Sequence, residues 1–229
     1  MKRGKKYIKI SKDLDRNKSY TLEEGLKQVK KTSYSKFTGS LEVHFDIVVP
    51  KDRDPKSIKG AVSLPYSTDV KSVSIAVFTT PDKEKDAKDA GADFVGLEQL
   101  IKDIKENKIT FDVAIATPAV MPKIAVLGKE LGPKGLMPNP KNGTVTDDIK
   151  SAVEEYKKGK QTFACDTSGV IHIKAGKLDL EDEKLIENVT TAISAVEDVL
   201  GKPYNQVVNR MHIAPTMGPS FKIDYKKTE

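Results

Sequence analysis

The sequence predicts a two-domain protein of mixed α+β and α/β class. Between residues 73 and 131, short apolar runs alternate with amphipathic stretches, which is typical of a three-layer, Rossmann-like α/β domain with parallel strands between helices. The segments on either side each contain too few strands for a sheet of their own. We therefore expect residues 1–67 and 159–229 to form one discontinuous, split α+β domain with a βαβ-type sheet, interrupted by the α/β domain at residues 68–158.

The N-terminal segment provides one helix and one strand. Apolar residues at helical spacing predict a helix over residues 22–31. Thr21 is placed to cap this helix, because Glu24 follows three residues later and completes a capping box. Apolar and polar residues then alternate over residues 41–49, which predicts a strand with one buried face.

Three strand–helix units make up the insertion. Strands are expected at residues 73–78, 93–96 and 111–116, and helices at residues 82–90, 97–104 and 121–131. The chain passes between the two domains twice, so we expect a hinge at residues 65–68 and 157–159.

The C-terminal segment supplies the rest of the split domain. A hairpin is expected over residues 162–174, with its turn at residues 166–169. A helix with an apolar stripe follows over residues 185–200. A polar, flexible loop at residues 212–220 then leads into a last strand at residues 220–225.

The net charge of +6 is concentrated at the N-terminus. The first 38 residues carry 12 Lys and Arg against 4 Asp and Glu, and six of these basic residues precede Asp13. Such a tail is suited to neutralising phosphates. A solvated, partly disordered tail without a dedicated partner has the same composition, so the charge suggests nucleic acid without proving it.

Membrane, metal and enzyme classes find little support. No run reaches the ~18 consecutive apolar residues of a spanning helix, and the N-terminus lacks the apolar core of an export signal. The single cysteine and three histidines offer neither a disulfide nor zinc-ligand spacing. Glycine-rich phosphate loops and the G-x-S-x-G motif are missing, and an ordinary strand residue explains Cys165 better than catalysis with His172 does. We expect no enzyme, no cofactor, no metal, and a reducing compartment.

Two loops have unusual compositions, although each alone could be a plain connection. Residues 127–144 read LGKELGPKGLMPNPKNGT, and residues 212–220 read HIAPTMGPS. Together they are similar to the signatures of the ribosomal protein L-one family, bacterial type, the protein of the mobile side stalk on the large ribosomal subunit. Further matches, among them Lys36-Phe37 and residues 90–96 and 169–172, extend the resemblance over nearly the full chain.

The resemblance implies a structural constituent of the large ribosomal subunit that makes and breaks no bond. Its expected partners are the stalk junction of large-subunit rRNA and the exit-site tRNA, whose release in deacylated form it accompanies. A third expected partner is its own mRNA, whose translation it would repress. The resemblance also implies a cytoplasmic location in the ribosome, and we expect no membrane partner and a monomer when the protein is free.

By motif matching, the resemblance places the RNA contacts in the split domain. They are Lys36, Phe37, Ser40, Glu42, Asp166, Ser168, His172, Thr216, Met217, Gly218 and Ser220. Gly39-Ser40 departs from the family's usual acid and threonine, and residues 65–68 depart from its usual hinge start. Residues 69–158, with 14 basic against 15 acidic residues, are expected to be a secondary RNA surface that is reached when the hinge closes.

The residue types suggest how each contact would work. Lys36 would meet a phosphate, and Phe37 would offer an apolar face to a ribose or base. The hydroxyl groups of Ser168, Thr216 and Ser220 would exchange hydrogen bonds with 2′-hydroxyl groups, which distinguish RNA from DNA.

The remaining contacts are less typical of RNA-binding proteins. Met217 and Gly218 would fill a shallow groove closely, where a larger residue at 218 should clash. Glu42 and Asp166 would accept from a 2′-hydroxyl or a guanine edge, or would orient a lysine. A purely structural role is the alternative for four of the contacts: Phe37, Glu42, Asp166 and His172.

Two functions of other classes stay open at this stage. The insertion and its hinge are also compatible with a small-ligand binder or enzyme that uses a cleft between the domains. The basic N-terminus is also compatible with a nonspecific RNA-coating protein, whose affinity would follow charge alone and weaken equally for all RNAs as salt rises.

Overall fold

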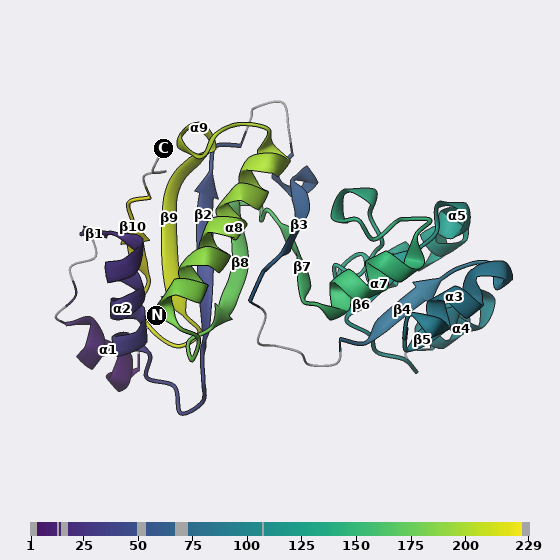
Figure 1. Cartoon of the computed structure of the whole chain (residues 1–229), viewed down its shortest axis with the longest axis horizontal. Helices are drawn as coiled ribbons and strands as arrows, with labels where there is room; N and C mark the ends of the chain where they lie inside the picture. Colours follow the sequence, from purple (N-terminus) through teal and green to yellow (C-terminus); the bar gives the residue numbers. More distant parts are fainter. Residues whose placement is uncertain are drawn as a thin grey trace. The chain divides into compact units, whose positions relative to one another are not determined.

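The computed structural model describes residues 4–12, 14, 18–49, 54–66, 73–106 and 108–225. The chain folds into two compact units, one of residues 1–68 and 163–229 and the other of residues 69–162. We call them the split unit and the inserted unit; Figure 1 shows both. Lys2 and Arg3 of the basic start, and residues 67–68 of the expected hinge, lie outside the described residues.

Residues 159–162 belong to the inserted unit, although the sequence analysis assigned them to the split domain. The physical reason is that strand β7 (Lys160–Ala164) starts almost directly after helix α7 (Ile149–Lys157) and stays tied to it. The Lys160 Nζ atom lies 2.6 Å from the Glu155 carboxylate on this helix.

The split unit is built on a five-stranded sheet. Its strands, in order across the sheet, are β1 (Ser19–Tyr20), β10 (Phe221–Ile223), β9 (Val208–Pro215), β2 (Ser40–Ile47) and β8 (Val170–Lys177). Among these described strands, β1 and β10 pair in parallel and all other neighbours are antiparallel. The expected βαβ-type connection is present, because α8 (Asp182–Leu200) joins β8 to β9, and these two strands run parallel to each other with β2 antiparallel between them. The loop expected over residues 212–220 is wrong in its first part, because residues 212–215 belong to the central strand β9.

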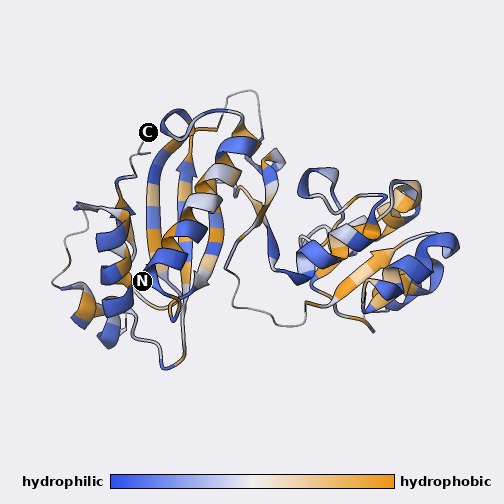
Figure 2. Cartoon of the chain, viewed as in Figure 1, coloured by the Kyte–Doolittle hydropathy of each residue, from blue (hydrophilic) through white to orange (hydrophobic). Residues whose placement is uncertain are grey.

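One face of this sheet is apolar and the other is polar. In β2, four apolar residues, among them Val43 and Phe45, are buried, whereas Glu42, His44 and Asp46 alternate with them and stay half-buried. The same alternation appears as orange and blue bands along β9 in Figure 2. The apolar face packs against the helices α2 (Leu22–Thr32) and α8 (Asp182–Leu200), and we call the polar face the open face.

The helices of the split unit begin where the sequence indicates. The Thr21 hydroxyl accepts the Glu24 N–H at 3.3 Å, so the predicted cap of α2 forms. Helix α8 begins at Asp182, three residues before the expected stripe, and ends at Gly201, which has a positive φ of 67°. The unit also contains α1 (Lys5–Ser11) and α9 (Tyr204–Val207).

The predicted hairpin at residues 162–174 forms only at its turn. Away from the turn, the two arms have different partners. Strand β7 pairs with β3 (Lys59–Ser63) in a two-stranded sheet, whereas β8 pairs with β2. In the described residues, an isolated bridge between Cys165 and Ile171 joins the two arms. The strands separate because β3 offers β7 a partner. A Cβ atom at Gly60 would lie 2.5 Å from Val199 and 2.7 Å from Phe163, so only glycine lets these side chains approach.

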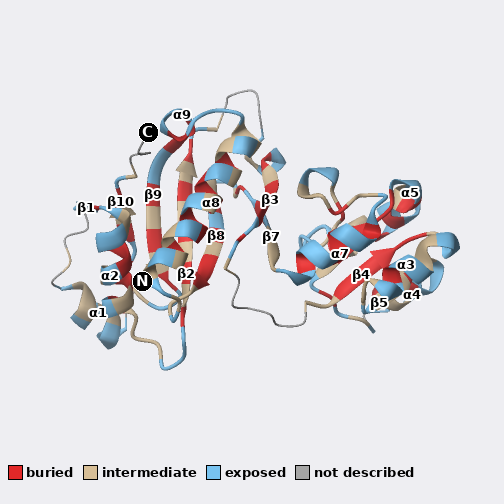
Figure 3. Cartoon of the chain, in the orientation of Figure 1, coloured by how far each residue is buried: buried red, intermediate tan, exposed pale blue. Residues whose placement is uncertain are grey.

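The inserted unit holds a parallel sheet of three strands. Their order is β5 (Phe94–Gly96), β4 (Ile75–Phe78) and β6 (Val113–Ala116). All four residues of β4 are buried, as its red arrow in Figure 3 shows. Ala76 and Phe78 pack into one hydrophobic cluster, and Ile75 and Val77 pack into another, so both faces of the strand are covered.

The helices of the inserted unit are short. Besides α7 they are α3 (Glu84–Asp89), α4 (Glu98–Lys105), α5 (Met121–Ile124) and α6 (Gly128–Leu131). The helix expected over residues 121–131 is broken by a 3-10 turn at Ala125–Leu127, next to Gly128, a poor helix former. The other 3-10 turns in the described part of the chain are Pro55–Ser57, Pro81–Lys83, Pro118–Val120 and Pro140–Asn142. No helix within the described ranges is long and apolar enough to cross a membrane.

Asn188 is expected to be a stability determinant of the split unit. Its fully buried amide donates to the carbonyl groups of Ala175 and Tyr66, at 2.7 and 2.8 Å, and accepts the Tyr66 N–H at 3.1 Å. Asn188→Leu would leave these backbone groups without partners, so we expect the free energy of unfolding to fall by about 2–4 kcal/mol.

Urea unfolding of the full chain measures this loss. Thr190→Ala is the matched control, because Thr190 lies on the exposed side of the same helix, and its effect should stay within about 0.5 kcal/mol. Equal stabilities of the two variants would contradict the assignment.

Candidate nucleic-acid interface

Two loops meet at one end of the five-stranded sheet. The Ser40 N–H donates to the Thr216 hydroxyl at 2.9 Å, and the Thr216 N–H donates to the Ser40 carbonyl at 3.0 Å. This pairing of the start of β2 with the end of β9 brings residues 33–40 beside residues 215–220. We call these two segments the loop pair. It contains seven of the expected contacts: Lys36, Phe37, Ser40, Thr216, Met217, Gly218 and Ser220.

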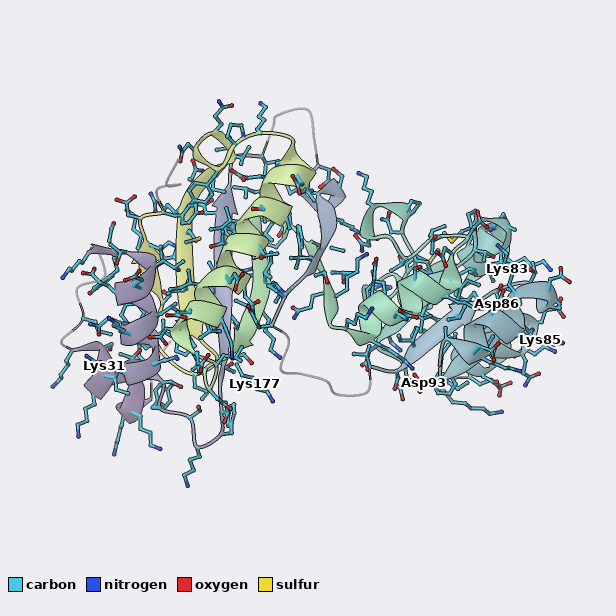
Figure 4. All side chains as sticks on the ribbon, viewed as in Figure 1. Lys31, Lys83, Lys85, Asp86, Asp93 and Lys177 are labelled. Carbon is cyan, nitrogen blue, oxygen red and sulfur yellow. The ribbon has the colours of Figure 1, made fainter. Side chains whose placement is uncertain are left out.

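The loop pair exposes two large apolar side chains. Phe37 is 59% exposed and Met217 is 41% exposed, and Lys36 is exposed beside Phe37. The alternative that Phe37 is a core residue is therefore wrong. Lys31 and Lys177, which the sequence analysis did not select, are labelled in Figure 4 on α2 and β8. Exposed apolar side chains with cations in the neighbouring segments are typical of a binding surface rather than of a plain turn.

Other members of the loop pair serve the protein's own packing. A Cβ atom at Gly218 would lie 2.5 Å from the Pro215 ring and 3.2 Å from the Thr32 carbonyl oxygen. A larger residue at 218 therefore clashes within the protein itself. The Thr216 hydroxyl already contacts the backbone of Ser40, so part of its hydrogen-bonding capacity is used inside the fold.

Asp166 and Ser168 lie at the opposite end of the sheet. The Ile47 N–H at the end of β2 donates to the Gly169 carbonyl of their turn, whereas Ser40 begins the same strand. Eight residues of extended strand separate these ends by roughly 20 Å. The structure therefore divides the expected contacts between two ends of the sheet.

The Asp166 carboxylate organises that turn. One oxygen accepts the N–H groups of Ser168 and Val170, both at 2.8 Å. These hydrogen bonds, with that from Val170 first, lower the pKa of the Asp166 carboxyl group. The structural role left open for Asp166 is thus present, and Thr167 and Ser168 are the exposed residues of the turn.

The open face connects the two ends. Glu42 and His172 lie on it, and His172 ends a row whose other members, Lys222, His212 and His44, are not among the expected contacts. Lys222, His212, His44 and His172 lie opposite one another on four adjacent strands. The Nδ1 atoms of His44 and His172 are 2.8 Å apart, so one of them is an unprotonated acceptor. The alternation of polar and apolar residues along β2 indicates that His44 faces away from the core. His212 could not be placed beside it, because residues 212–215 were expected to form a loop and not the strand β9.

The environment of the row disfavours positive charge on two of its histidines. Burial, followed by the charges of His172 and His212, lowers the pKa of His44. Burial, Arg210 and Lys222 lower the pKa of His212. Neutral imidazoles can donate and accept hydrogen bonds, and an approaching phosphate would favour their protonation.

The inserted unit contributes a different surface. Residues 127–144 are fastened to it by the Tyr156 hydroxyl, which donates to the Asn142 carbonyl at 2.8 Å, while Lys134 is exposed at their centre. Elsewhere on this unit, some charges are paired: Lys83 and Asp86, both labelled in Figure 4, contact Asp147 and Lys150, each at 3.1 Å. The described residues contain no cluster suited to a metal ion.

Comparisons with known proteins agree with the two loop signatures. The model of the Ribosomal protein L1p/L10e family matches residues 29–219. The chain is 40% identical over 229 residues to the large ribosomal subunit protein uL1 of Kosmotoga olearia, covering 99% of this chain and 98% of that protein. It is 43% identical over 228 residues to the protein of the same name from Thermosipho africanus, covering 97% of each.

The two half-buried histidines, His44 and His212, predict an acid-sensitive fold. Their ordinary pKa is 6.5, and the folded state lowers it, so below that pH the unfolded chain binds more protons than the folded chain. We expect the free energy of unfolding to be at its full value above about pH 7 and to fall as the pH is lowered through 6.5 towards 5. His44→Gln and His212→Gln should each flatten this slope, measured by urea unfolding at fixed ionic strength. Unchanged slopes in both variants would contradict the assignment.

Two substitutions separate the roles of Asp166. Asp166→Ala removes the acceptor of two backbone N–H groups, and we expect it to lower the free energy of unfolding. Asp166→Asn keeps an acceptor oxygen and should retain most of the stability. If Asp166→Asn still weakens RNA binding as strongly as Asp166→Ala, the carboxylate itself contacts RNA and a purely structural role is excluded.

Proposed function

This chain belongs to the Ribosomal protein L1p/L10e family, and on that premise we propose that it is a structural constituent of the large ribosomal subunit in the cytoplasm. The family is a structural, non-enzymatic one, which excludes the enzyme alternative. Within the subunit, we propose that the split unit binds the stalk junction of the large-subunit rRNA.

The observation that carries this proposal is the exposure of Phe37 and Met217 at the loop pair. Apolar side chains on the surface of a protein lose little by being covered and gain when they stack on an unpaired base or a ribose. Both lie in loops next to the hydrogen-bonded pair of Ser40 and Thr216, which anchors the two loops to each other and limits the ordering that binding requires. Lys36, next to Phe37, is suited to a phosphate of the same nucleotide stretch.

The open face extends this surface towards the second end of the sheet. Ser168 is exposed there, and the neutral histidines between the two ends can bond to 2′-hydroxyl groups. Two separated contact regions joined by a polar strip suit a folded junction, because both regions can be reached at once only by an RNA of matching shape. A uniform duplex would engage the cations without using the apolar side chains.

We further propose two roles for this surface in translation. The rRNA stalk would move with deacylated tRNA as that tRNA leaves the exit site. A similar junction in the protein's own mRNA would compete for the same surface, so free protein would repress its own synthesis only when rRNA is saturated. Both roles follow from one RNA surface with alternative ligands.

Binding assays with two side-chain truncations test the interface. Wild-type protein should prefer the stalk rRNA fragment over an RNA duplex of equal length by about a hundredfold, ~2.7 kcal/mol, at low and at near-physiological salt. Phe37→Ala and Met217→Ala should each weaken binding to the fragment by about 1–3 kcal/mol. Their folding stability should stay nearly unchanged, because both side chains are exposed.

The matched control is Val126→Ala, since Val126 is 62% exposed on the inserted unit. Its binding should equal that of the wild-type protein. If the wild-type protein binds the fragment and the duplex with equal affinity, and both affinities fall equally as the salt concentration rises, the protein is a nonspecific RNA-coating protein. Unchanged RNA affinity of both Phe37→Ala and Met217→Ala would show that the loop pair is not the RNA interface.

A further inference from the structure

A cavity of about 220 Å³ adjoins the loop pair on the side of β10. The N-terminal segment forms one part of its wall, and the end of β9 with the start of β10 forms the other. The residues that line it are Tyr7, Ser11, Leu14, Lys18, Tyr20, His212, Pro219, Ser220, Phe221 and Lys222. Of these, only Ser220 is among the RNA contacts that the sequence analysis selected.

Aromatic rings form a fixed part of this cavity. The rings of Tyr20 and Phe221 pack edge to face, with centroids 5.7 Å apart at 82°, and both residues are buried. Tyr7, on α1, is half-buried and lines the cavity from a different segment. The Tyr20 and Phe221 rings belong to the core and support the cavity, so Tyr7 is the aromatic residue of the lining that can stack on a nucleobase. Every nucleobase has a π-face, so such stacking does not depend on which base is bound.

The polar groups of the cavity suit an anion. Lys18 and Lys222 both line it, and the Lys18 Nζ atom lies 5.1 Å from the centre of the Tyr20 ring. His212 and the hydroxyl groups of Ser11 and Ser220 add hydrogen-bonding partners. None of the described lining residues is a carboxylate. Aromatic walls with two cations and hydroxyl groups match a base, a sugar and a phosphate.

The size and position of the cavity indicate an RNA nucleotide outside a duplex. Its volume is several times the ~30 Å³ share of a water molecule, so it has room for a flat ring. A paired base is stacked inside its helix and cannot enter, whereas an unpaired one can turn out of its strand. Ser220 belongs both to the loop pair and to this cavity, so an RNA strand held by Phe37 and Met217 lies within reach of it.

We propose that this cavity receives one unpaired nucleotide of the bound RNA, with its base against Tyr7 and its phosphate near Lys18 and Lys222. The proposal rests on the proposed function, because it assumes that RNA occupies the loop pair. It assigns a recognition role to α1 and to the basic N-terminal segment that depends on Tyr7 and Lys18, and not on net charge alone.

Substitutions on α1 test the proposal in the full-length chain. Tyr7→Ala should weaken binding to the stalk rRNA fragment about tenfold, 1.4 kcal/mol, whereas Tyr7→Phe should keep the wild-type affinity. Ile8→Ala is the matched control, because Ile8 is 45% exposed on the same helix and does not line the cavity. Its affinity should lie within about twofold of the wild-type value. Equal losses for Tyr7→Ala and Ile8→Ala would overturn the proposal.

A second measurement does not depend on the stalk fragment. Adenosine monophosphate, at millimolar concentration, should shift the backbone amide NMR signals of Tyr7, Ser220 and Phe221 in a saturable way, and Tyr7→Ala should abolish the shifts. Adenosine alone and inorganic phosphate alone should each act more weakly. Equal shifts with phosphate alone, or no shifts with any probe, would overturn the proposal.

The two measurements separate this inference from the proposed function. Specific binding of the stalk fragment without nucleotide shifts and without a Tyr7 effect would leave the proposed function standing and remove the cavity from it. Saturable nucleotide shifts without preference for the stalk fragment would remove the proposed function and keep a nucleotide site in the cavity.

Discussion

The pairing of β2 with β8 on one side and β9 on the other is the interaction on which the rest of the split unit depends. These antiparallel ladders join the N-terminal segment to the C-terminal segment, which are separated in the sequence by the inserted unit. Because side chains alternate along β2, the same pairing buries Val43 and Phe45 against the helices and leaves the intervening polar residues on the open face. A slip of one residue would exchange the two faces and destroy both the core and the candidate interface.

This register also decides which surface residues are available to a partner. It closes Ser40 onto Thr216 and thereby fixes the loop pair, in which Phe37 and Met217 stay exposed. Gly218 is needed by the protein's own packing at the same place, and Asp166 at the far turn is occupied with backbone N–H groups. A residue that is typical of a family's interface can therefore stabilise the protein's own structure, and this role does not require that its side chain contacts RNA.

Charge alone describes the surface poorly. The inserted unit has nearly balanced charges, and several of its lysines are paired with carboxylates. The basic N-terminal segment, in contrast, includes a helix whose Tyr7 side chain lines a cavity, so the described part of it is ordered structure. Specific recognition comes from the shape and the aromatic rings near these cations, since phosphates are attracted equally to any lysine.

Local periodicity and contiguous motifs were enough to predict the helices α2 and α8, the strands β2 and β4, the family resemblance and the absence of enzyme motifs. Long-range contacts in the folded chain were needed to show that β9 is a strand, that β7 leaves its hairpin for β3, and that the expected contacts lie at two ends of one sheet. Strand partners and register arise from contacts far apart in the chain, which no local pattern contains. The exposure of Phe37 and the row of histidines have the same origin, since a phenylalanine in a loop and a histidine in a strand acquire their surroundings only when distant segments meet.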